Sequence, residues 1–273
     1  MAFDINGSTE LYGIMGNPVT HSLSPAMHNA AFRHLGLNKV YLPFPVQDAA
    51  AAIRAFKTLG VKGVSVTIPH KQAVIDQLDR IDPVAASIGA VNTLVIEEDA
   101  TVFGLNTDWL GANAALKEHL GQLQGRRVVL LGAGGSARAI GFGLLEEGAQ
   151  LTLASRTPER GQALAAALGC PWLPQESATE QQADILINAT SVGMGAQRDS
   201  SPVAAEMLVN FSLVMDIVYS PLETRLLREA KVAGCQTING LAMLLYQGVA
   251  QFERWTGVAA PVEVMRQQLL QRL

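Results

Sequence analysis

The stretch Arg127–Ala137, RVVLLGAGGSA, decides the fold of the second half of the chain. Its apolar run Val128–Leu131 is typical of a buried strand, and Arg138–Glu147, which follows the glycines, has the periodicity of a helix. The glycines let the backbone turn tightly and approach a ligand, and the amide groups at the start of a helix attract negative charge. Between a strand and a helix this motif predicts a site for the pyrophosphate of a dinucleotide, with a plain tight turn as the alternative. The predicted contacts are Gly132, Ala133, Gly134, Gly135, Ser136 and Ala137.

The order of strand, turn and helix repeats after this motif. Further apolar runs, separated by helical or loop sequence, lie at Leu151–Ala154, Asp184–Asn188 and Leu213–Val218. Such alternation is typical of parallel strands joined by helical crossovers. We therefore expect a Rossmann-type, doubly wound α/β domain in this part of the chain.

The strand Leu151–Ala154 is followed by Ser155, Arg156 and Thr157, and Arg160 lies one helical turn further on. A fold of this kind that binds NAD places an acidic residue here, against the ribose hydroxyl groups. Arginine reverses the charge and can bind a 2′-phosphate through charge-assisted hydrogen bonds, each worth about 1.5–3 kcal/mol. The sequence thus predicts NADP (NADPH) as the cofactor, with these four residues near the phosphate. Two solvated surface arginines are the alternative.

The first part of the chain predicts a second α/β layer structure, because short apolar runs alternate with helical patterns. Ser24 followed by Pro25 predicts an N-cap with proline at the first helical position, and Gly36 ends that helix. Asp48 and Gly60 bracket the next helix in the same way. The predicted strands are Leu11–Met15, Val40–Phe44, Val64–Ile68 and Val91–Ile96.

Polar residues gather at the ends of the predicted strands, where α/β sheets bind their ligands. They lie in Val64–Lys71, Ala90–Thr93 and Gly104–Asp108. Lys71 follows Pro69 at the predicted start of a helix, where the positive end of the helix dipole disfavours a lysine.

Lys71 is for this reason a candidate for proton transfer, and a solvated lysine on an exposed first turn is the alternative. Asp108 stands after Asn106 and Thr107 and before a helical pattern, so it is either a second catalytic candidate or a helix N-cap.

Composition restricts the class of protein. A length of 273 residues predicts one large domain or two modest ones, of which we favour two, and a hydrophobic content of 49% with a formal charge of −4 predicts a compact soluble protein. Basic residues form no stripe for a nucleic-acid backbone, and no segment is long enough to cross a bilayer, so we expect neither nucleic acid nor a membrane as partner. Because Met1–Glu10 lacks the features of a signal sequence, we expect a cytoplasmic location.

Cys170 and Cys235 lack a C-x-x-C spacing and are predicted to be buried thiols, and the five histidines are dispersed, so no metal site is expected. The tail, Leu241–Thr256 and Pro261–Leu273, has helical periodicity and no strand left to pair with. We expect it to pack back on the first lobe and to leave a cleft between two lobes. The predicted domains are residues 1–110 with 240–273, and residues 111–239, with hinges near Leu110–Gly125 and Asn239–Gly240.

The chain resembles the shikimate dehydrogenase family over nearly its whole length, through nine motifs in the family's order. They are GNPVTHSLSP (16–25), GVSVTIPHK (63–71), GAVNT (89–93), GLNTD (104–108), GAGGSARA (132–139), SRT (155–157), INATSVGM (187–194), DIVYSP (216–221) and NGLAMLLYQ (239–247). The resemblance implies a substrate domain that is residues 1–110 plus 240–273 and an NADP-binding domain that is residues 111–239. It further implies reversible hydride transfer between NADPH and 3-dehydroshikimate, giving shikimate in aromatic amino-acid (chorismate) biosynthesis.

The same resemblance implies roles for individual residues. Lys71 and Asp108 would be the catalytic pair, and Ile217, Gly240 and Met243 would contact the cofactor, with Met243 as ordinary core the alternative. The implied substrate contacts are Ser22, Ser24, Ser65, Thr67, Lys71, Asn92, Asp108, Tyr219 and Gln247. A monomer or homodimer is expected.

Two positions depart from the family pattern. Ser65 replaces an asparagine. Because the serine side chain is shorter, the sequence does not decide whether residue 65 contacts a hydroxyl group of the substrate. Trp109 replaces a glycine and either narrows the cleft or starts its helix against the core. Three other activities are compatible with the sequence: a quinate/shikimate dehydrogenase of relaxed specificity, an enzyme of another cyclic acid such as aminoshikimate, and a non-catalytic module that senses NADPH or shikimate.

Overall fold

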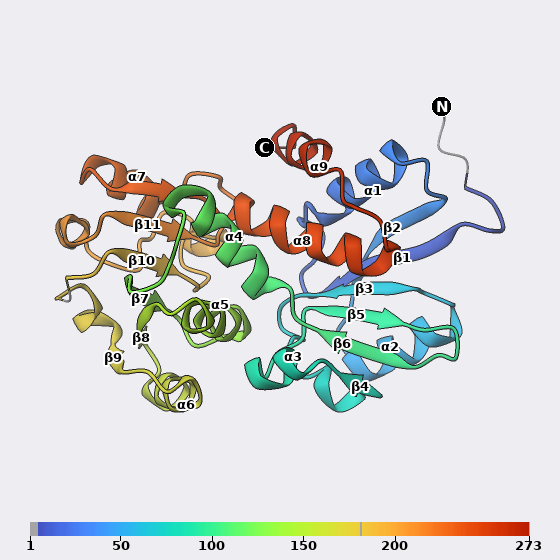
Figure 1. Cartoon of the computed structure of the whole chain (residues 1–273), viewed down its shortest axis with the longest axis horizontal. Coiled ribbons are helices and arrows are strands. Elements are labelled where there is room, and N and C mark those ends of the chain that lie inside the picture. The colour runs from blue at the N-terminus through green and yellow to red at the C-terminus, as the bar shows by residue number, and fades with distance from the viewer. Residues whose placement is uncertain (1–4, 181, 273) are drawn as a thin grey trace. The chain divides into compact units, whose positions relative to one another are not determined.

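The computed structural model describes residues 5–180 and 182–272 (Figure 1). The first four residues of the N-terminal segment and the last residue of the tail, on which predictions were made above, lie outside the described residues. The chain divides into two compact units. The first unit comprises the residues up to Thr107 together with Gln247–Leu273, and the second unit is Asp108–Tyr246.

Within its described residues the first unit contains a six-stranded mixed sheet in the order β2-β1-β3-β5-β6-β4. β1 is parallel to β2 and β3, whereas β5 is antiparallel to both β3 and β6. Consequently the carboxyl ends of β1, β3 and β6 and the amino end of β5 lie along one edge of the sheet. The strands are β1 (Glu10–Gly16), β2 (Lys39–Pro45), β3 (Gly63–Val66), β4 (Arg80–Ile81), β5 (Thr93–Ile96) and β6 (Val102–Leu105).

Alternation along β3 assigns the two faces of this sheet. Val64 and Val66 pack in a hydrophobic cluster with Ile53 and Phe56 of α2. Gly63 faces the other way, because a Cβ atom on it would lie 2.4 Å from the indole nitrogen of Trp255 on α8. The helices of this unit are α1 (Ser24–His34), α2 (Ala49–Thr58), α3 (Pro83–Ile88), α9 (Val262–Leu270) and the later part of α8 (Gly240–Thr256), and a short 3-10 helix spans Ile75–Gln77.

The C-terminal helices pack on the first unit, as the sequence predicted: the later part of α8 lies on the sheet and α9 packs against α1. On α8, Phe252 and Trp255 pack against aromatic rings of α1 and of the first two strands, with centroid separations of 5.4 Å for Phe252–Phe32 and 5.6 Å for Trp255–Tyr12. The indole N–H of Trp255 also donates to the carbonyl of Leu94 at 3.0 Å. Apolar packing and a partly buried hydrogen bond thus hold α8 on the strands.

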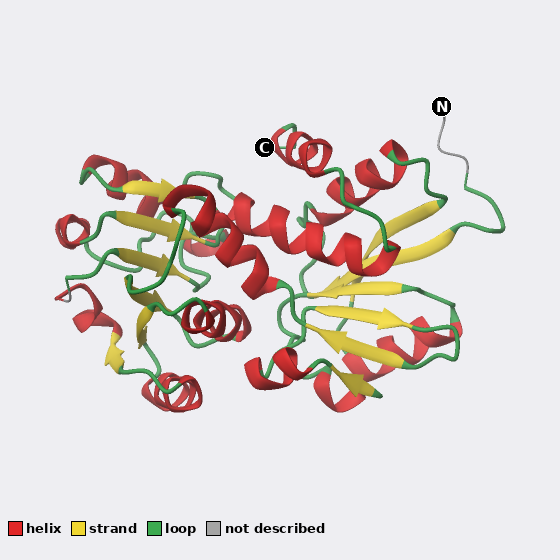
Figure 2. Cartoon of the chain, viewed as in Figure 1, coloured by secondary structure: helices red, strands yellow, loops and turns green. Residues whose placement is uncertain are grey.

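The second unit contains a sheet in which every described strand pairing is parallel. Its order, β9-β8-β7-β10-β11-β12, reverses direction between β7 and β10, which is the doubly wound arrangement predicted from the sequence. Helices flank its strands (Figure 2). The strands are β7 (Arg127–Leu131), β8 (Gln150–Ser155), β9 (Trp172–Pro174), β10 (Ile185–Asn188), β11 (Leu213–Asp216) and β12 (Gln236–Ile238), and the helices include α4 (Asp108–Leu120), α5 (Gly135–Glu146), α6 (Pro158–Leu168) and α7 (Arg225–Val232).

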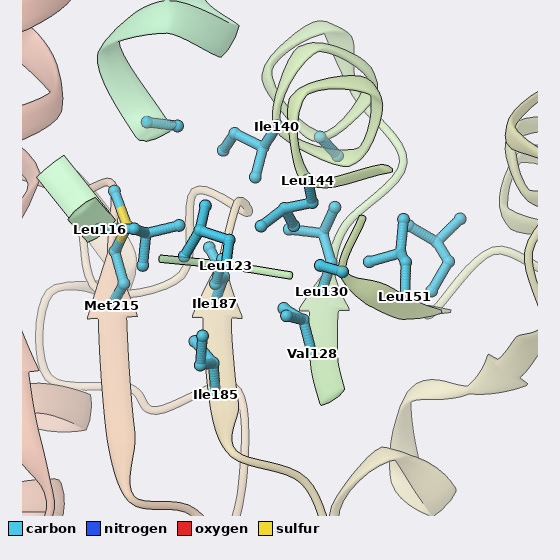
Figure 3. Packing of buried hydrophobic residues seen from close by; sticks show 14 of the residues in the cluster. Leu116, Leu123, Val128, Leu130, Ile140, Leu144, Leu151, Ile185, Ile187 and Met215 are labelled. Carbon is cyan, nitrogen blue, oxygen red and sulfur yellow. The ribbon is translucent and has the colours of Figure 1, made fainter. Parts of the chain in front are cut away.

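The core on one face of this sheet lies under α5 (Figure 3). Ile140 and Leu144 of α5 point toward Val128 and Leu130 of β7 and Ile187 of β10, and all five side chains are almost fully buried. Burying each contributes about 1.5–3 kcal/mol. Because α5 is fixed on the sheet in this way, the turn that precedes it has a defined position.

The cysteine prediction is correct for one residue. Cys235 is buried, and its thiol donates to the carbonyls of Leu208 and Phe211, whereas Cys170 is only half-buried. Both are free thiols. In the described residues no helix is both long and apolar enough to span a bilayer, and no cluster of three or more potential metal ligands occurs.

Candidate active site

The turn after β7 requires glycine at its first position. Gly132 has a φ of +119°, and a Cβ atom there would lie 2.9 Å from the carbonyl oxygen of Ala189. Its N–H donates to the carbonyl of Ala154 at 2.8 Å, which ties the turn to β8. Any side chain would therefore collide with the backbone that follows β10.

The second glycine of the turn leaves the helix start open. Gly134 is the N-cap of α5, no side chain caps the helix there, and a Cβ atom on this residue would meet nothing within 4 Å. The first N–H groups of a helix point outward without partners in the helix and carry partial positive charge. The space and the donors both fit the pyrophosphate group of a dinucleotide.

The loop after β8 is held in place by hydrogen bonds of the buried Ser155, whereas the residues that follow Ser155 are exposed. The Ser155 hydroxyl donates to the carbonyl of Thr157 at 3.1 Å and accepts from the indole N–H of Trp172 at 3.0 Å. Gly161 makes room for this pair, because a Cβ atom there would lie 2.0 Å from Ser155 Oγ. The Ser155 hydroxyl group is therefore engaged in hydrogen bonds within the protein. No pattern in the sequence indicates that Trp172 is its partner.

Arg156, Thr157 and Arg160 are exposed at the same loop and at the start of α6. Among the described residues neither arginine forms an ion pair. Two cations at the end of the strand that follows the glycine turn fit the phosphate of NADP and not the free hydroxyl groups of NAD.

A buried polar network joins the ends of β10 and β11. The Asn188 side chain donates to the Asp216 carboxylate at 3.0 Å and accepts from the Thr190 hydroxyl at 2.7 Å. Asp216 also accepts from the Thr224 hydroxyl at 2.7 Å and from the N–H of Val218 at 3.0 Å. These residues were not singled out in the sequence, although Asn188 and Asp216 lie in two of its quoted motifs. The network fixes the loops next to the glycine turn.

Asp216 makes stability depend on pH. Burial raises the pKa of its carboxyl group to about 6, against the opposing hydrogen bonds from Val218, Thr224 and Asn188. A folded-state pKa above the unfolded value means that the stabilising contribution is present below about pH 4 and is lost as pH rises through about 6. Relative to Asp216→Asn, the wild-type free energy of unfolding should fall by up to about 3 kcal/mol across this range.

Denaturant unfolding at several pH values measures this difference. Asp79→Asn is the matched control, because the Val102 N–H and then Lys57 lower the pKa of Asp79, so its contribution should change with pH in the opposite sense. A difference between wild type and Asp216→Asn that does not vary with pH would contradict the assignment.

The remaining predicted cofactor residues lie directly after β11 (Ile217) and in the first turn of α8 (Gly240 and Met243). Gly240 starts α8 against the backbone of Ile217, and a Cβ atom on it would lie 2.2 Å from the Ile217 carbonyl oxygen. Ile217 and Tyr219 are half-buried. Met243 is 6% exposed and packs in the core cluster beneath α5, as expected for an ordinary core methionine.

In the first unit, the edge of the sheet brings the segments of Lys71 and Asn92 together. The N–H of Val91 donates to the Lys71 carbonyl at 2.7 Å, and the N–H of Val66 donates to the Asn92 carbonyl at 2.7 Å. The N–H of Thr107 donates to the Asn92 side chain at 2.8 Å. Thus the three polar segments of the sequence do meet at one edge.

The predicted helix at Lys71 is wrong. Residues 68–74 form turns, and the 3-10 helix begins only at Ile75. In an α-helix the Lys71 carbonyl would accept from the N–H of Ile75, but it accepts from Val91, and Ile75 donates to Gln72 at 3.1 Å. Pairing with the neighbouring segment therefore replaces helix propagation, and the helix-dipole argument for Lys71 does not apply.

Ser24 is also not the N-cap that was predicted. The N–H of Met27 donates to the Leu23 carbonyl at 3.1 Å, so α1 begins one residue earlier than predicted and Leu23 is its N-cap. The Ser22 hydroxyl accepts from the N–H of Ser24 at 3.3 Å, which brings the two predicted substrate-binding serines together. Asp48, by contrast, caps α2 as predicted, accepting from the N–H of Ala51 at 3.0 Å.

Asn92 and Gln247, two predicted substrate contacts, lie in one buried network. The Asn92 amide nitrogen is 3.5 Å from the side-chain oxygen of Gln247 and 3.0 Å from the Thr107 hydroxyl. Ser65 belongs to the same network. Thr67, half-buried, packs on Gly16 at the end of β1, where a Cβ atom would lie 2.3 Å from the threonine methyl group.

Asp108 begins α4 and is only 4% exposed. Its neighbour Trp109 packs edge-on against Phe142 of α5, with ring centroids 5.9 Å apart. Of the two alternatives for Trp109, the structure supports a residue that starts its helix against the core.

Comparison with known proteins identifies the family. Family models match residues 14–94 (shikimate dehydrogenase substrate binding domain), 114–202 (shikimate/quinate 5-dehydrogenase) and 240–270 (shikimate 5'-dehydrogenase C-terminal domain). The shikimate dehydrogenase (NADP(+)) of Methanothermobacter thermautotrophicus is 48% identical, over 97% of each chain. The chain belongs to the shikimate dehydrogenase family.

Solved structures of shikimate dehydrogenases share the fold. The Thermus thermophilus enzyme, solved in complex with NADP(H) and shikimate, is 39% identical and superimposes with a TM-score of 0.87, covering 97% of this chain and 100% of its own. Quinate dehydrogenase from Corynebacterium glutamicum, in complex with NAD, is 32% identical with a TM-score of 0.89, covering 96% and 99%. The predicted fold, with an N-terminal α/β lobe and a Rossmann-type lobe, is thereby confirmed.

Proposed function

We propose that this chain is an NADP-dependent shikimate dehydrogenase that catalyses the reversible reduction of 3-dehydroshikimate to shikimate. Its curated relatives over nearly the full length carry that name. The observation that carries the proposal is the polar edge of the first sheet, where the Lys71 segment is hydrogen-bonded beside Asn92. The proposed domain roles are substrate binding by the first unit and cofactor binding by the second.

The residues of the second unit fit NADP, which supplies a hydride to the substrate carbonyl when bound in its reduced form. Gly132–Ala137 and the first turn of α5 would hold the pyrophosphate, and Arg156 with Arg160 would hold the 2′-phosphate. Ser155 and Gly161 support that loop from inside. Ile217 and Gly240 would line the part of the cofactor site that holds the nicotinamide ring.

The chemistry assigned to the chain itself is proton transfer and charge stabilisation. As the carbonyl is reduced, negative charge develops on its oxygen, and the Lys71 ammonium would stabilise that charge while the Lys71/Asp108 pair transfers the proton. The proposed substrate contacts are Ser22, Ser24, Thr67, Asn92, Tyr219 and Gln247.

A quinate/shikimate dehydrogenase is the second candidate, since the quinate dehydrogenase of C. glutamicum shares the fold. The exposed Arg156 favours NADP over NAD for either activity. We further propose a cytoplasmic location, which suits two free cysteines, and a monomeric or homodimeric state.

An absorbance assay of NADPH formation tests the function. Purified protein with shikimate and NADP should form NADPH, and replacing shikimate by quinate or NADP by NAD should lower kcat/KM by at least about tenfold, because an unpaired buried polar group or a lost charge-assisted bond costs this much. Comparable rates on quinate would favour the second candidate. Ligand binding without turnover would indicate a sensing module.

A further inference from the structure

Seven polar side chains lie buried between the first sheet and α8, each no more than 8% exposed. They come from β2, β3, β5 and its preceding residue, the segment between β6 and α4, and α8: Tyr41, Ser65, Asn92, Thr93, Thr107, Gln247 and Gln251. Hydroxyl and amide groups in such a place must pair donors with acceptors, because an unpaired one is costly. The direction of each hydrogen bond therefore determines which groups of the network donate and which accept.

A backbone group fixes the direction at one end of the network. The N–H of Thr107, which can only donate, lies 2.8 Å from one side-chain atom of Asn92, so that atom is the amide oxygen Oδ1. The Thr93 hydroxyl lies 2.7 Å from the same oxygen and must donate to it. The single hydrogen of Thr93 is thereby used.

A second backbone group fixes the amide of Gln251. One of its side-chain atoms lies 3.2 Å from the Asn92 carbonyl, which can only accept, and 2.9 Å from Thr93 Oγ1. That atom is the nitrogen Nε2, so the oxygen Oε1 faces Ser65 at 2.7 Å and Ser65 must donate. The Tyr41 hydroxyl, 2.6 Å from Ser65, donates in turn.

The hydrogen bonds thus run in one direction, from Tyr41 through Ser65, Gln251 and Thr93 to Asn92. The Asn92 nitrogen consequently points to the Thr107 hydroxyl at 3.0 Å and to the oxygen of Gln247 at 3.5 Å. An inverted Asn92 amide would place its NH₂ group against the N–H of Thr107, two donors facing each other. The Thr107 N–H therefore sets the orientation of the Asn92 amide, and the chain from Tyr41 holds that amide in position beside Gln247, the other amide that we assign to substrate binding.

We propose that Ser65 is a positioning residue and not a substrate contact. Acting through Gln251 and Thr93, it holds the Asn92 amide in place beside Gln247, in the orientation that the Thr107 N–H sets, so that Asn92 and Gln247 present a fixed arrangement to a ring hydroxyl group of the substrate. This inference rests on the proposed function.

Steady-state kinetics with shikimate and NADP test this role. Ser65→Ala should raise KM for shikimate about tenfold, the equivalent of one lost oriented hydrogen bond, and leave KM for NADP unchanged. Thr93→Val, which interrupts the same chain nearer Asn92, should do the same, and the double variant should be no worse than either single one. Ser87→Ala is the matched control, because Ser87 is an exposed serine of α3 whose hydroxyl donates to the Pro83 carbonyl of its own helix, and its KM should stay near wild type.

Substrate analogues and a rescue separate positioning from a general loosening of the fold. The kinetics are repeated with shikimate analogues that each lack one ring hydroxyl group. For Ser65→Ala, the ratio of kcat/KM on shikimate to kcat/KM on the analogue should fall for one analogue only. Ser65→Asn, which crowds Gln251, should be impaired and should be rescued by adding Gln251→Ala. Unchanged KM in both Ser65→Ala and Thr93→Val, additive effects of the two, or equal weakening for all analogues would overturn the proposal. Wild-type protein inactive on shikimate would overturn the proposed function itself.

Discussion

Replacing Lys71 with alanine is expected to lower kcat by about 10²- to 10⁴-fold, the usual contribution of general acid–base assistance. The backbone of Lys71 is fixed by the hydrogen bond from Val91 at 2.7 Å, next to Asn92, so the side chain leaves the sheet edge from a defined point. Binding of NADPH should be retained, because the proposed cofactor residues all belong to the second unit. Stopped-flow or steady-state assays with 3-dehydroshikimate, together with fluorescence titration of NADPH, measure both quantities.

Two further lysine variants sharpen this test. Lys57→Ala removes a surface lysine that is paired with Asp79 and should leave kcat unchanged. Lys71→Arg keeps the positive charge but cannot release a proton, so it should stay near the alanine level if proton transfer dominates and recover activity if charge stabilisation dominates. Wild-type turnover by Lys71→Ala would remove Lys71 from the catalytic role.

The four central strands of the second unit were predictable because their signals are local, whereas the short outer strands β9 and β12 were not predicted. A buried strand, two glycines and a helix follow one another within Arg127–Glu146, and the φ of +119° at Gly132 is a property of that turn alone. The order of strands follows from the rule for parallel crossovers. Sequence patterns of this kind report interactions between residues that are close in the chain.

The first unit was less predictable because its decisive contacts are distant in the chain. Gln251 reaches Asn92 over 159 positions and Ser65 over 186, and no periodicity in the sequence reports such a pairing. For the same reason Lys71 was assigned to a helix: the proline pattern is local, whereas the competing bond from Val91 is tertiary. The family resemblance supplied the site residues there, but not the network that orients them.

Replacing Arg156 with alanine is expected to raise KM for NADPH about 10- to 100-fold while leaving the use of NADH nearly unchanged. Each charge-assisted hydrogen bond to the 2′-phosphate contributes about 1.5–3 kcal/mol, and NADH has no such phosphate. Arg156 is exposed at the end of β8, on a loop held by Ser155 and Trp172, so its loss should not disturb the turn at Gly132. Kinetics with both cofactors at fixed ionic strength measure the change in preference.

The dependence on salt distinguishes an arginine that binds phosphate from one that only raises the local potential. Added salt should raise KM for NADPH in the wild type and less so in Arg156→Ala, because exposed charges are screened beyond about 8–10 Å at physiological ionic strength. Arg160→Ala should have a smaller effect in the same direction, and Arg228→Ala, an exposed arginine on α7, should have none. If Arg156→Ala kept the wild-type preference for NADPH over NADH, the cofactor would have to be selected elsewhere in the second unit.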